Sequence, residues 1–187
     1  MTHFLDKFKF CPVCGSANFN IHNIKSKKCE DCGFTYYINP SAATACFIRN
    51  SKNELLICTR ANNPAKGSFD LPGGFVDMDE TLEHGMLREV MEETHIEGKD
   101  LHYLFSIPNL YVYSDFPVHT TDVFFELRVK DFTKAMRGDD AATLSVVKIE
   151  ELDPEVFGLR SIKQAVALYL ENYKNKYKKE SYEGIRN

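Results

Sequence analysis

The sequence predicts an α/β fold with a small metal-binding ribbon in front of it, and three observations lead there. Strand-like segments alternate with two well-separated helical segments after residue 41, which favours an α/β sandwich around a mixed sheet. Four of the six cysteines lie in the first 32 residues. The 187 residues are 43% hydrophobic and 27% charged, a globular composition with room for one core and an appendage. We expect a ribbon over 1–40 and a main domain over 41–187.

Local patterns indicate the elements of the main domain. Strands are expected over 42–48, 54–59, 101–107, 121–129 and 144–149, because their residues are apolar or alternate in polarity. Residues 49–53 form a polar turn, and residues 62–68 form a loop rich in Asn, Pro and Gly. Helices are expected over about 81–94 and 159–178. The second carries a core-facing stripe at helical spacing: Ile162, Ala165, Val166, Tyr169, Leu170 and Tyr173.

Charge and hydropathy exclude several classes of protein. No apolar run approaches the ~20 residues of a membrane span, and no secretory signal is visible, so a cytoplasmic location is expected. A net charge of −4 makes a nucleic-acid partner unlikely on electrostatic grounds. Lysines cluster at positions 25, 27 and 28 and again at 174, 176, 178 and 179. We interpret both groups as solvated surface.

The four early cysteines form two C-x-x-C pairs, Cys11 with Cys14 and Cys29 with Cys32, separated by fourteen residues. Four thiolates suit one tetrahedral Zn²⁺ and leave no open position for water, so we expect one structural zinc per chain. A redox dithiol normally needs only one such pair, and an iron–sulfur cluster fits this spacing less well. Cys46 and Cys58 stand inside apolar runs and are expected to be buried small hydrophobes.

The first predicted helix carries three glutamates on one face. Glu89, Glu92 and Glu93 fall within an arc of about 100° on a helical wheel, where they repel one another unless cations lie between them. Oxygen ligands of this kind suit Mg²⁺ or Mn²⁺. An ordinary acidic surface helix would show the same cluster. The preceding residues 71–74, Leu-Pro-Gly-Gly, predict a rigid turn that brings backbone carbonyls close to a metal.

Residues 74–96 resemble the Nudix box, G-x5-E-x7-R-E-U-x-E-E-x-G-U with U aliphatic, at every defined position but one. The resemblance covers about residues 40–178, and the ribbon resembles that of NADH pyrophosphatase-like members. It implies a Nudix α/β/α sandwich. The exception is His95, which stands where the family has glycine at the helix end. We expect His95 to adopt a left-handed conformation at a modest cost in stability, roughly 1 kcal/mol.

The resemblance also implies a site that hydrolyses a nucleoside diphosphate linked to another group. Glu89 and Glu93 are the expected principal ligands of Mg²⁺ or Mn²⁺, and one of them takes the proton of the attacking water. Glu92 and the Gly73 carbonyl complete the site, while Arg88 and Glu80 support its geometry. The remaining candidates are Asp139 or Asp140 as a further acid, Arg60 and Lys66 as phosphate contacts, and Phe69, Tyr111 and Tyr113 as base-stacking residues. The alternatives are a surface turn for the two aspartates, solvated surface for the two cations, and core packing, which the strand-like surroundings favour, for the aromatic residues.

The substrate is left open by the sequence. NADH pyrophosphatases carry Ser-Gln-Pro-Trp after the box, whereas residues 106–111 here are Ser-Ile-Pro-Asn-Leu-Tyr, and the chain has no Trp. NAD(H), ADP-ribose, FAD, dinucleoside polyphosphates and nucleoside triphosphates all remain. Two alternatives are a nucleotide-sensing transcription regulator without turnover, which intact box glutamates disfavour, and a hydrolase of capped RNA, which lysines 25, 27 and 28 leave open. A homodimer is also expected from ribbon-bearing relatives.

Overall fold

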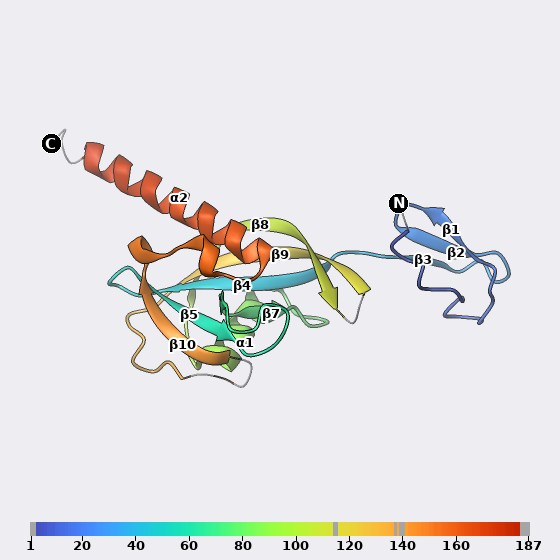
Figure 1. The fold of residues 1–187 in the computed structure, drawn as a ribbon, viewed down its shortest axis with the longest axis horizontal. Coiled ribbons are helices and arrows are strands. Elements are labelled where there is room, and N and C mark those ends of the chain that lie inside the picture. Colours follow the sequence, from blue (N-terminus) through green and yellow to red (C-terminus); the bar gives the residue numbers. More distant parts are fainter. Residues whose placement is uncertain (1–2, 114–115, 137, 139–140, 184–187) are drawn as a thin grey trace. The chain divides into compact units, whose positions relative to one another are not determined.

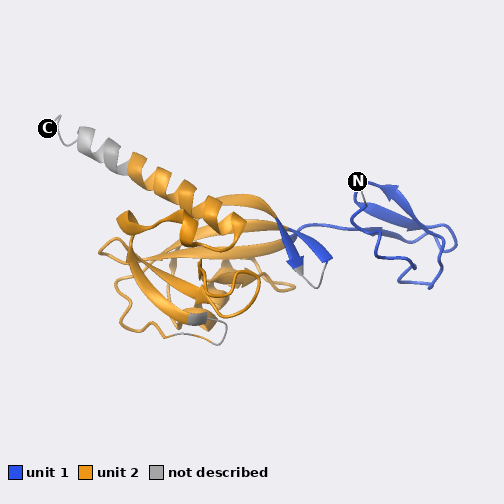
Figure 2. Cartoon of the chain, viewed as in Figure 1, with its two compact units in different colours: residues 1–41, 110–119 blue, residues 42–109, 120–187 orange. Residues whose placement is uncertain are grey.

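A computed structural model describes residues 3–113, 116–136, 138 and 141–183. The chain divides into two compact units, the first comprising residues 1–41 and 110–119 and the second residues 42–109 and 120–187 (Figure 2). The domain boundary expected near residue 40 stays a prediction. No helix within the described ranges is long and apolar enough to cross a membrane.

The first unit contains a small antiparallel sheet that the sequence did not predict. Its strands are β1 (Phe19–Asn23), β2 (Ser26–Cys29) and β3 (Thr35–Tyr37), paired in that order. The core beneath them is minimal and consists of Cys11, Phe19 and Cys29, with Phe34 packed against it. So little apolar surface does not stabilise a fold of this length without another source of free energy.

Lys27 corrects the interpretation of the first lysine cluster as solvated surface. Its side chain is buried in β2, where Nζ donates a hydrogen bond to the Phe8 carbonyl oxygen at 2.6 Å and lies 5.0 Å from the centre of the Phe19 ring. Lys25 and Lys28 are exposed as expected. Lys25 lies in the turn before β2 and Lys28 faces outward from the strand, whereas Lys27 faces inward, so the three lysines do not form one surface.

The second unit is built on a seven-stranded sheet. The strands follow the order β10-β5-β4-β9-β8, with β6 paired to β5 and β7 paired to β4. Their bounds are β4 (Ser41–Arg49), β5 (Glu54–Arg60), β6 (Phe69–Asp70), β7 (Gly73–Phe75), β8 (Asp100–Tyr113), β9 (Phe116–Arg128) and β10 (Ala141–Lys148). The five predicted strands are confirmed, although β8, β9 and β10 extend beyond the predicted ends.

The turn between β4 and β5 shows why these two strands pair locally. The Asn50 side-chain oxygen accepts hydrogen bonds from the backbone N–H groups of Lys52 and Glu54 at 2.9 and 3.0 Å. Asn53 adopts a positive φ of 60°, which Asn tolerates better than most residues. The predicted turn over 49–53 is therefore confirmed, and its polar side chains stabilise it.

Helices cover both faces of this sheet (Figure 1). Helix α1 (Leu82–Thr94) packs on one face through Met86 and Val90, and α2 (Arg160–Glu183) packs on the other. The short helices η1 (Ile149–Glu151) and η2 (Pro154–Val156) precede α2. The stripe predicted for α2 is confirmed: Ile162, Ala165, Val166 and Tyr169 are buried, while Leu170 and Tyr173 pack at its edge.

Strand β9 serves both cores at once. Val123, Phe125 and Leu127 belong to the core under α1, whereas Phe124 belongs to the core under α2. Because both faces are covered, residues 123–127 are apolar except for Glu126 instead of alternating with polar residues. The strand predicted over 121–129 is therefore buried on both of its faces.

A buried carboxylate ties β9 to α2. Glu126 is 5% exposed and accepts hydrogen bonds from the Tyr169 hydroxyl at 2.6 Å and from Arg128 Nε at 2.7 Å, with Arg49 Nη1 at 3.5 Å. Burial raises the pKa of the Glu126 carboxyl, but these donors outweigh it and the pKa lies below its ordinary value. The interaction therefore favours the ionised form.

We expect Tyr169→Phe to lower the free energy of unfolding at pH 7 by about 1.5–3 kcal/mol, because Glu126 loses a charge-assisted hydrogen bond. A depressed folded-state pKa stabilises the fold above the unfolded-state value, about 4.3, and the contribution is lost as the pH falls through the folded-state value. Urea unfolding at several pH values tests this. A difference that stays constant down to pH 3 contradicts it, and exposed Tyr103→Phe is the control.

Candidate functional site

The two cysteine pairs form matching knuckles in the first unit. In each, the first cysteine's N–H donates to the carbonyl five residues on, Cys11 to Ser16 and Cys29 to Phe34, both at 2.8 Å. The glycine that follows each pair has φ near 75° and donates back to the first cysteine's carbonyl. The left-handed glycines close the turns, so each knuckle presents its two sulfurs to the same side.

The four sulfurs of Cys11, Cys14, Cys29 and Cys32 lie within 4.8 Å of one another. The Sγ atoms of Cys11 and Cys32 are 3.7 Å apart, and those of Cys14 and Cys29 are 3.6 Å apart. Four sulfurs at ~2.3 Å from a tetrahedral Zn²⁺ would be about 3.8 Å apart. The four-cysteine cluster therefore fits the expected zinc.

The glutamate face belongs to α1, which begins and ends as the sequence predicts. Thr81 is the N-cap, and its Oγ1 accepts a hydrogen bond from the His84 N–H at 3.2 Å. His95 ends the helix in the left-handed region with φ 55° and ψ 22°, which confirms the expected conformation. The His95 ring also hydrogen bonds through Nδ1 to the Met136 carbonyl oxygen at 3.1 Å. A glycine at this position could not form this hydrogen bond.

Arg88 connects the helix to the loop before it. Nε and Nη2 donate to the two oxygens of Glu80 at 2.9 and 3.0 Å, and Nη2 also donates to the Phe75 carbonyl oxygen at 3.0 Å. Nη1 donates to Glu89 at 2.8 Å and to Glu92 at 3.2 Å. A planar guanidinium with several donors suits this arrangement, which orients two carboxylates and holds residues 75–80 against α1.

Glu89 and Glu93 both face strand β7. The Gly73 N–H donates to Glu93 Oε2 at 3.1 Å, and a Cβ on Gly74 would lie 2.5–2.8 Å from the atoms of the Glu89 carboxylate. Only glycine leaves room for the carboxylate there. The prediction that residues 71–74 form a turn is wrong in part, because residues 73–75 pair with residues 43–45 of β4.

The electrostatics of the glutamate face favour a cation. Burial raises the pKa of Glu89, and the negative charges of Glu92 and Asp77 raise it further, against the lowering effect of Arg88. Glu89 Oε1 is held by Arg88, whereas the Glu92 side chain is 59% exposed. Three acidic groups with one guanidinium leave a negative site with oxygen donors, and this donor set fits Mg²⁺ or Mn²⁺.

The segment before β10 is attached to the end of α1. The N–H groups of Met136 and Gly138 donate to the carbonyl oxygens of Thr94 and Glu93 at 3.0 and 2.8 Å. These bonds satisfy carbonyls that a helix end otherwise leaves unpaired. The candidate acids Asp139 and Asp140 follow immediately, but both lie outside the described residues, so their proposed role stays a prediction.

The candidate substrate contacts differ in their surroundings. The Arg60 guanidinium pairs with buried Asp70 and donates from Nε to the Pro64 carbonyl oxygen at 2.7 Å, while Lys66 is exposed. Phe69 packs on Phe157 with ring centres 6.2 Å apart. Tyr111 belongs to the first unit, and the side chain of Tyr113 lies outside the described residues.

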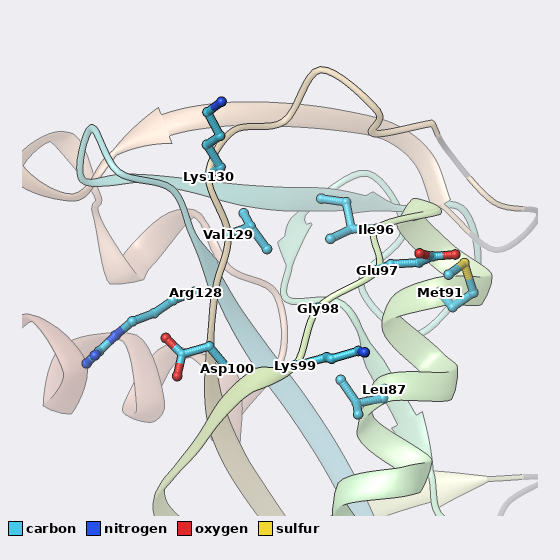
Figure 3. A pocket seen from close by; sticks show the side chains of 10 residues that line it. All are labelled: Leu87, Met91, Ile96, Glu97, Gly98, Lys99, Asp100, Arg128, Val129 and Lys130. Carbon is cyan, nitrogen blue, oxygen red and sulfur yellow. The ribbon is translucent and has the colours of Figure 1, made fainter.

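A pocket on the other side of α1 is separate from the glutamate face. Leu87 and Met91 project from α1 toward residues 96–100, and residues 128–130 complete the lining (Figure 3). The pocket has a volume of about 670 Å³. Its ten lining residues do not include Glu89, Glu92 or Glu93, so its size alone does not identify a reaction site.

One buried polar side chain of strand β4, Thr44, was not among the site residues expected from the sequence. Thr44 is 4% exposed, and its Oγ1 has no hydrogen-bond partner among the described residues. It stands opposite Gly74 in the β4–β7 pair. The available signal was a lone threonine inside the small apolar run of residues 42–48.

Comparison with known proteins agrees with this geometry. The NUDIX domain family profile matches residues 39–166. An ADP-ribose pyrophosphatase from Methanocaldococcus jannaschii is 33% identical over 126 residues, which are 66% of this chain and 71% of that protein. The NAD-capped RNA hydrolase NudC of Vibrio atlanticus is 32% identical over 106 residues, or 57% of this chain. The aligned part is only 39% of that relative's length.

Solved structures share the fold. A NUDIX hydrolase from Nitrosomonas europaea superposes with a TM-score of 0.65 at 23% identity, covering 89% of this chain and 93% of that one. The NUDIX domain of Shewanella oneidensis NrtR, crystallised with ADP ribose, gives a TM-score of 0.59 at 17% identity, covering 73% and 90%. These likenesses confirm the predicted α/β fold with a mixed sheet between two helices. The family profile, which covers more than half of the sequence, shows that this chain is a member of the Nudix hydrolase family.

Proposed function

We propose that this protein hydrolyses the diphosphate linkage of a nucleoside diphosphate joined to another group, with Mg²⁺ or Mn²⁺. The observation that carries the proposal is the convergence of Glu89 and Glu93 on strand β7, with Arg88 holding Glu89 and Glu92. All the box carboxylates are present and oriented. A member that only binds nucleotides has no need of this arrangement.

Glu89, Glu92 and Glu93 would hold the divalent cation, with the Gly73 carbonyl as a further ligand. When bound, the cation supplies charge neutralisation for the diphosphate and a lowered pKa for the attacking water. Glu89 and Glu93 are both candidates for the general base that accepts the proton of the attacking water, and Glu89 is the one whose carboxylate Arg88 holds. Arg88 fixes the direction of that carboxylate, and Glu80 fixes Arg88.

The substrate class is nucleotide-derived. The relatives named for ADP-ribose and for NAD-capped RNA support two candidates, both of which contain a diphosphate between two ribose groups. Lys66 is an exposed candidate for a phosphate contact. Arg60 is a weaker one, since Asp70 already neutralises it, and the packing of Phe69 on Phe157 favours a core role over base stacking.

The test is hydrolysis by the full chain with Mg²⁺ or Mn²⁺ and a panel of substrates. The panel contains NADH, NAD, ADP-ribose, FAD, diadenosine polyphosphates, nucleoside triphosphates and NAD-capped RNA, with products followed by chromatography. We expect one class to be cleaved well above the others. Tight binding of one nucleotide with no cleavage of any would replace the proposal with a sensor function.

A further inference from the structure

Thr44 carries a buried hydroxyl in a strand whose other buried side chains are apolar. Residues of β4 alternate between the two cores, so that Ala45 and Phe47 face α2 while Cys46 and Ile48 face α1. Thr44 therefore lies on the α1 face. It is the polar residue at the start of a series that is otherwise apolar on that face.

The pairing of β4 with β7 places Thr44 beside Glu89. Thr44 is directly opposite Gly74 in the antiparallel register, and side chains of opposite residues extend to the same face with their Cβ positions about 4.5–5.5 Å apart. The Cβ position of Gly74 is 2.5 Å from Glu89 Oε1. The Glu89 carboxylate thus occupies the place of a side chain at Gly74, next to the position of Thr44 on the paired strand.

A buried hydroxyl without a partner has a cost in folding free energy. Thr44 Oγ1 has no partner within the described part of the chain, although Thr120 and Thr94, which are equally buried, both donate hydrogen bonds at 2.6 Å. Its position opposite Gly74 puts this donor on the side of the sheet where the Glu89 carboxylate lies. The Thr44 hydroxyl is therefore available to donate a hydrogen bond when the site holds a cation.

We propose that Thr44 is a positioning residue of the cation site, whose hydroxyl donates a hydrogen bond to the Glu89 carboxylate, directly or through one water, when the site is loaded. This inference rests on the proposed function, because it requires the glutamate face to bind a divalent cation. Removal of a group that orients a metal ligand typically weakens metal binding about 10- to 100-fold. Thr44 acts on Glu89 and does not itself touch the reacting atoms.

The experiment compares Thr44→Val and Thr44→Ser with the wild type by titrating the nucleotide-free protein with Mn²⁺ and following free Mn²⁺ by electron paramagnetic resonance. We expect Thr44→Val, which keeps the volume and removes the hydroxyl, to weaken Mn²⁺ binding about 10- to 100-fold. Thr44→Ser should restore most of the affinity. Equal Mn²⁺ affinity of wild type and Thr44→Val overturns the role of Thr44 and leaves the proposed function standing.

Thermal unfolding in EDTA supplies a second measurement. We expect Thr44→Val to unfold at the wild-type temperature or above it, because it removes an unpaired buried hydroxyl. The matched control is Thr120→Val, which removes a hydroxyl bonded to Asp122; it should lower the unfolding temperature and leave Mn²⁺ affinity unchanged. A drop for Thr44→Val as large as that of the control overturns the proposal. A wild type that binds no Mn²⁺ at all defeats the proposed function as well.

Discussion

Glu93→Gln is expected to reduce turnover about 10²- to 10⁴-fold, the range that a positioned acid or base contributes, while the fold stays intact. Glutamine keeps the shape of the side chain and can still accept the hydrogen bond from the Gly73 N–H. It removes the negative charge that a hard cation needs. The measurement is the rate with saturating substrate and a series of Mg²⁺ concentrations, together with the unfolding temperature.

The unfolding temperature separates a site effect from a structural one. Glu93 shares α1 with two other acidic site residues, so removal of one charge relieves repulsion and should not destabilise the metal-free protein. Glu97→Gln is the matched control, because Glu97 is an exposed glutamate beyond the end of the same helix. Full activity in Glu93→Gln, with the control also active, would remove Glu93 from the site.

The glutamate face could be predicted because its members belong to one helix. Spacing of three and four residues determines which side chains share a face, and the local signals at Thr81 and His95 locate the two helix ends. The contact between Arg88 and Glu80 could also be predicted, because both residues belong to the same box. The box places Arg88 eight residues after Glu80, and the bend at residues 77–80 brings the two side chains together.

The surroundings of that face depend on contacts between residues distant in the sequence, which no local pattern reveals. Gly73 and Gly74 favour a turn when considered alone, yet they form a strand because β4, about thirty residues earlier, supplies the partner. Thr44 is a lone hydroxyl in an otherwise apolar strand. Only the pairing of the strands places it opposite Gly74, whose Cβ position adjoins the Glu89 carboxylate. The register between strands therefore determines the neighbours of the glutamate face, which residue spacing along one helix cannot predict.

Lys27 illustrates the same limit in the ribbon. Three lysines in four positions indicate a solvated surface by composition, but β2 turns the middle one toward the Phe8 carbonyl and the Phe19 ring. The prediction of a solvated surface is confirmed at Lys25, in the turn before β2, and at Lys28, on the exposed side of the strand. An exposed and a buried lysine differ here only in the direction of their side chains.

Removal of zinc is expected to unfold the ribbon and to spare the second unit. Among its described residues the first unit buries few apolar side chains, chiefly Leu5, Phe19 and two cysteines of the cluster, so we expect most of its folding free energy to come from the metal. Zinc binding contributes roughly 10–16 kcal/mol in peptides of this kind, far above what this core supplies. We expect about one zinc per chain in the wild type and a near-complete loss of zinc in Cys29→Ser.

Elemental analysis and amide hydrogen exchange would measure the two consequences together. In Cys29→Ser, peptides from residues 11–37 should exchange rapidly, whereas peptides from β4, β5 and α1 should keep their protection, because both cores that they form consist of residues of the second unit. Cys58→Ala is the control: it removes a buried thiol of β5 and should retain the zinc. Iron in place of zinc, or four free thiols with no metal and a protected ribbon, would contradict the assignment, since the knuckles would then hold their shape by packing that the structure does not contain.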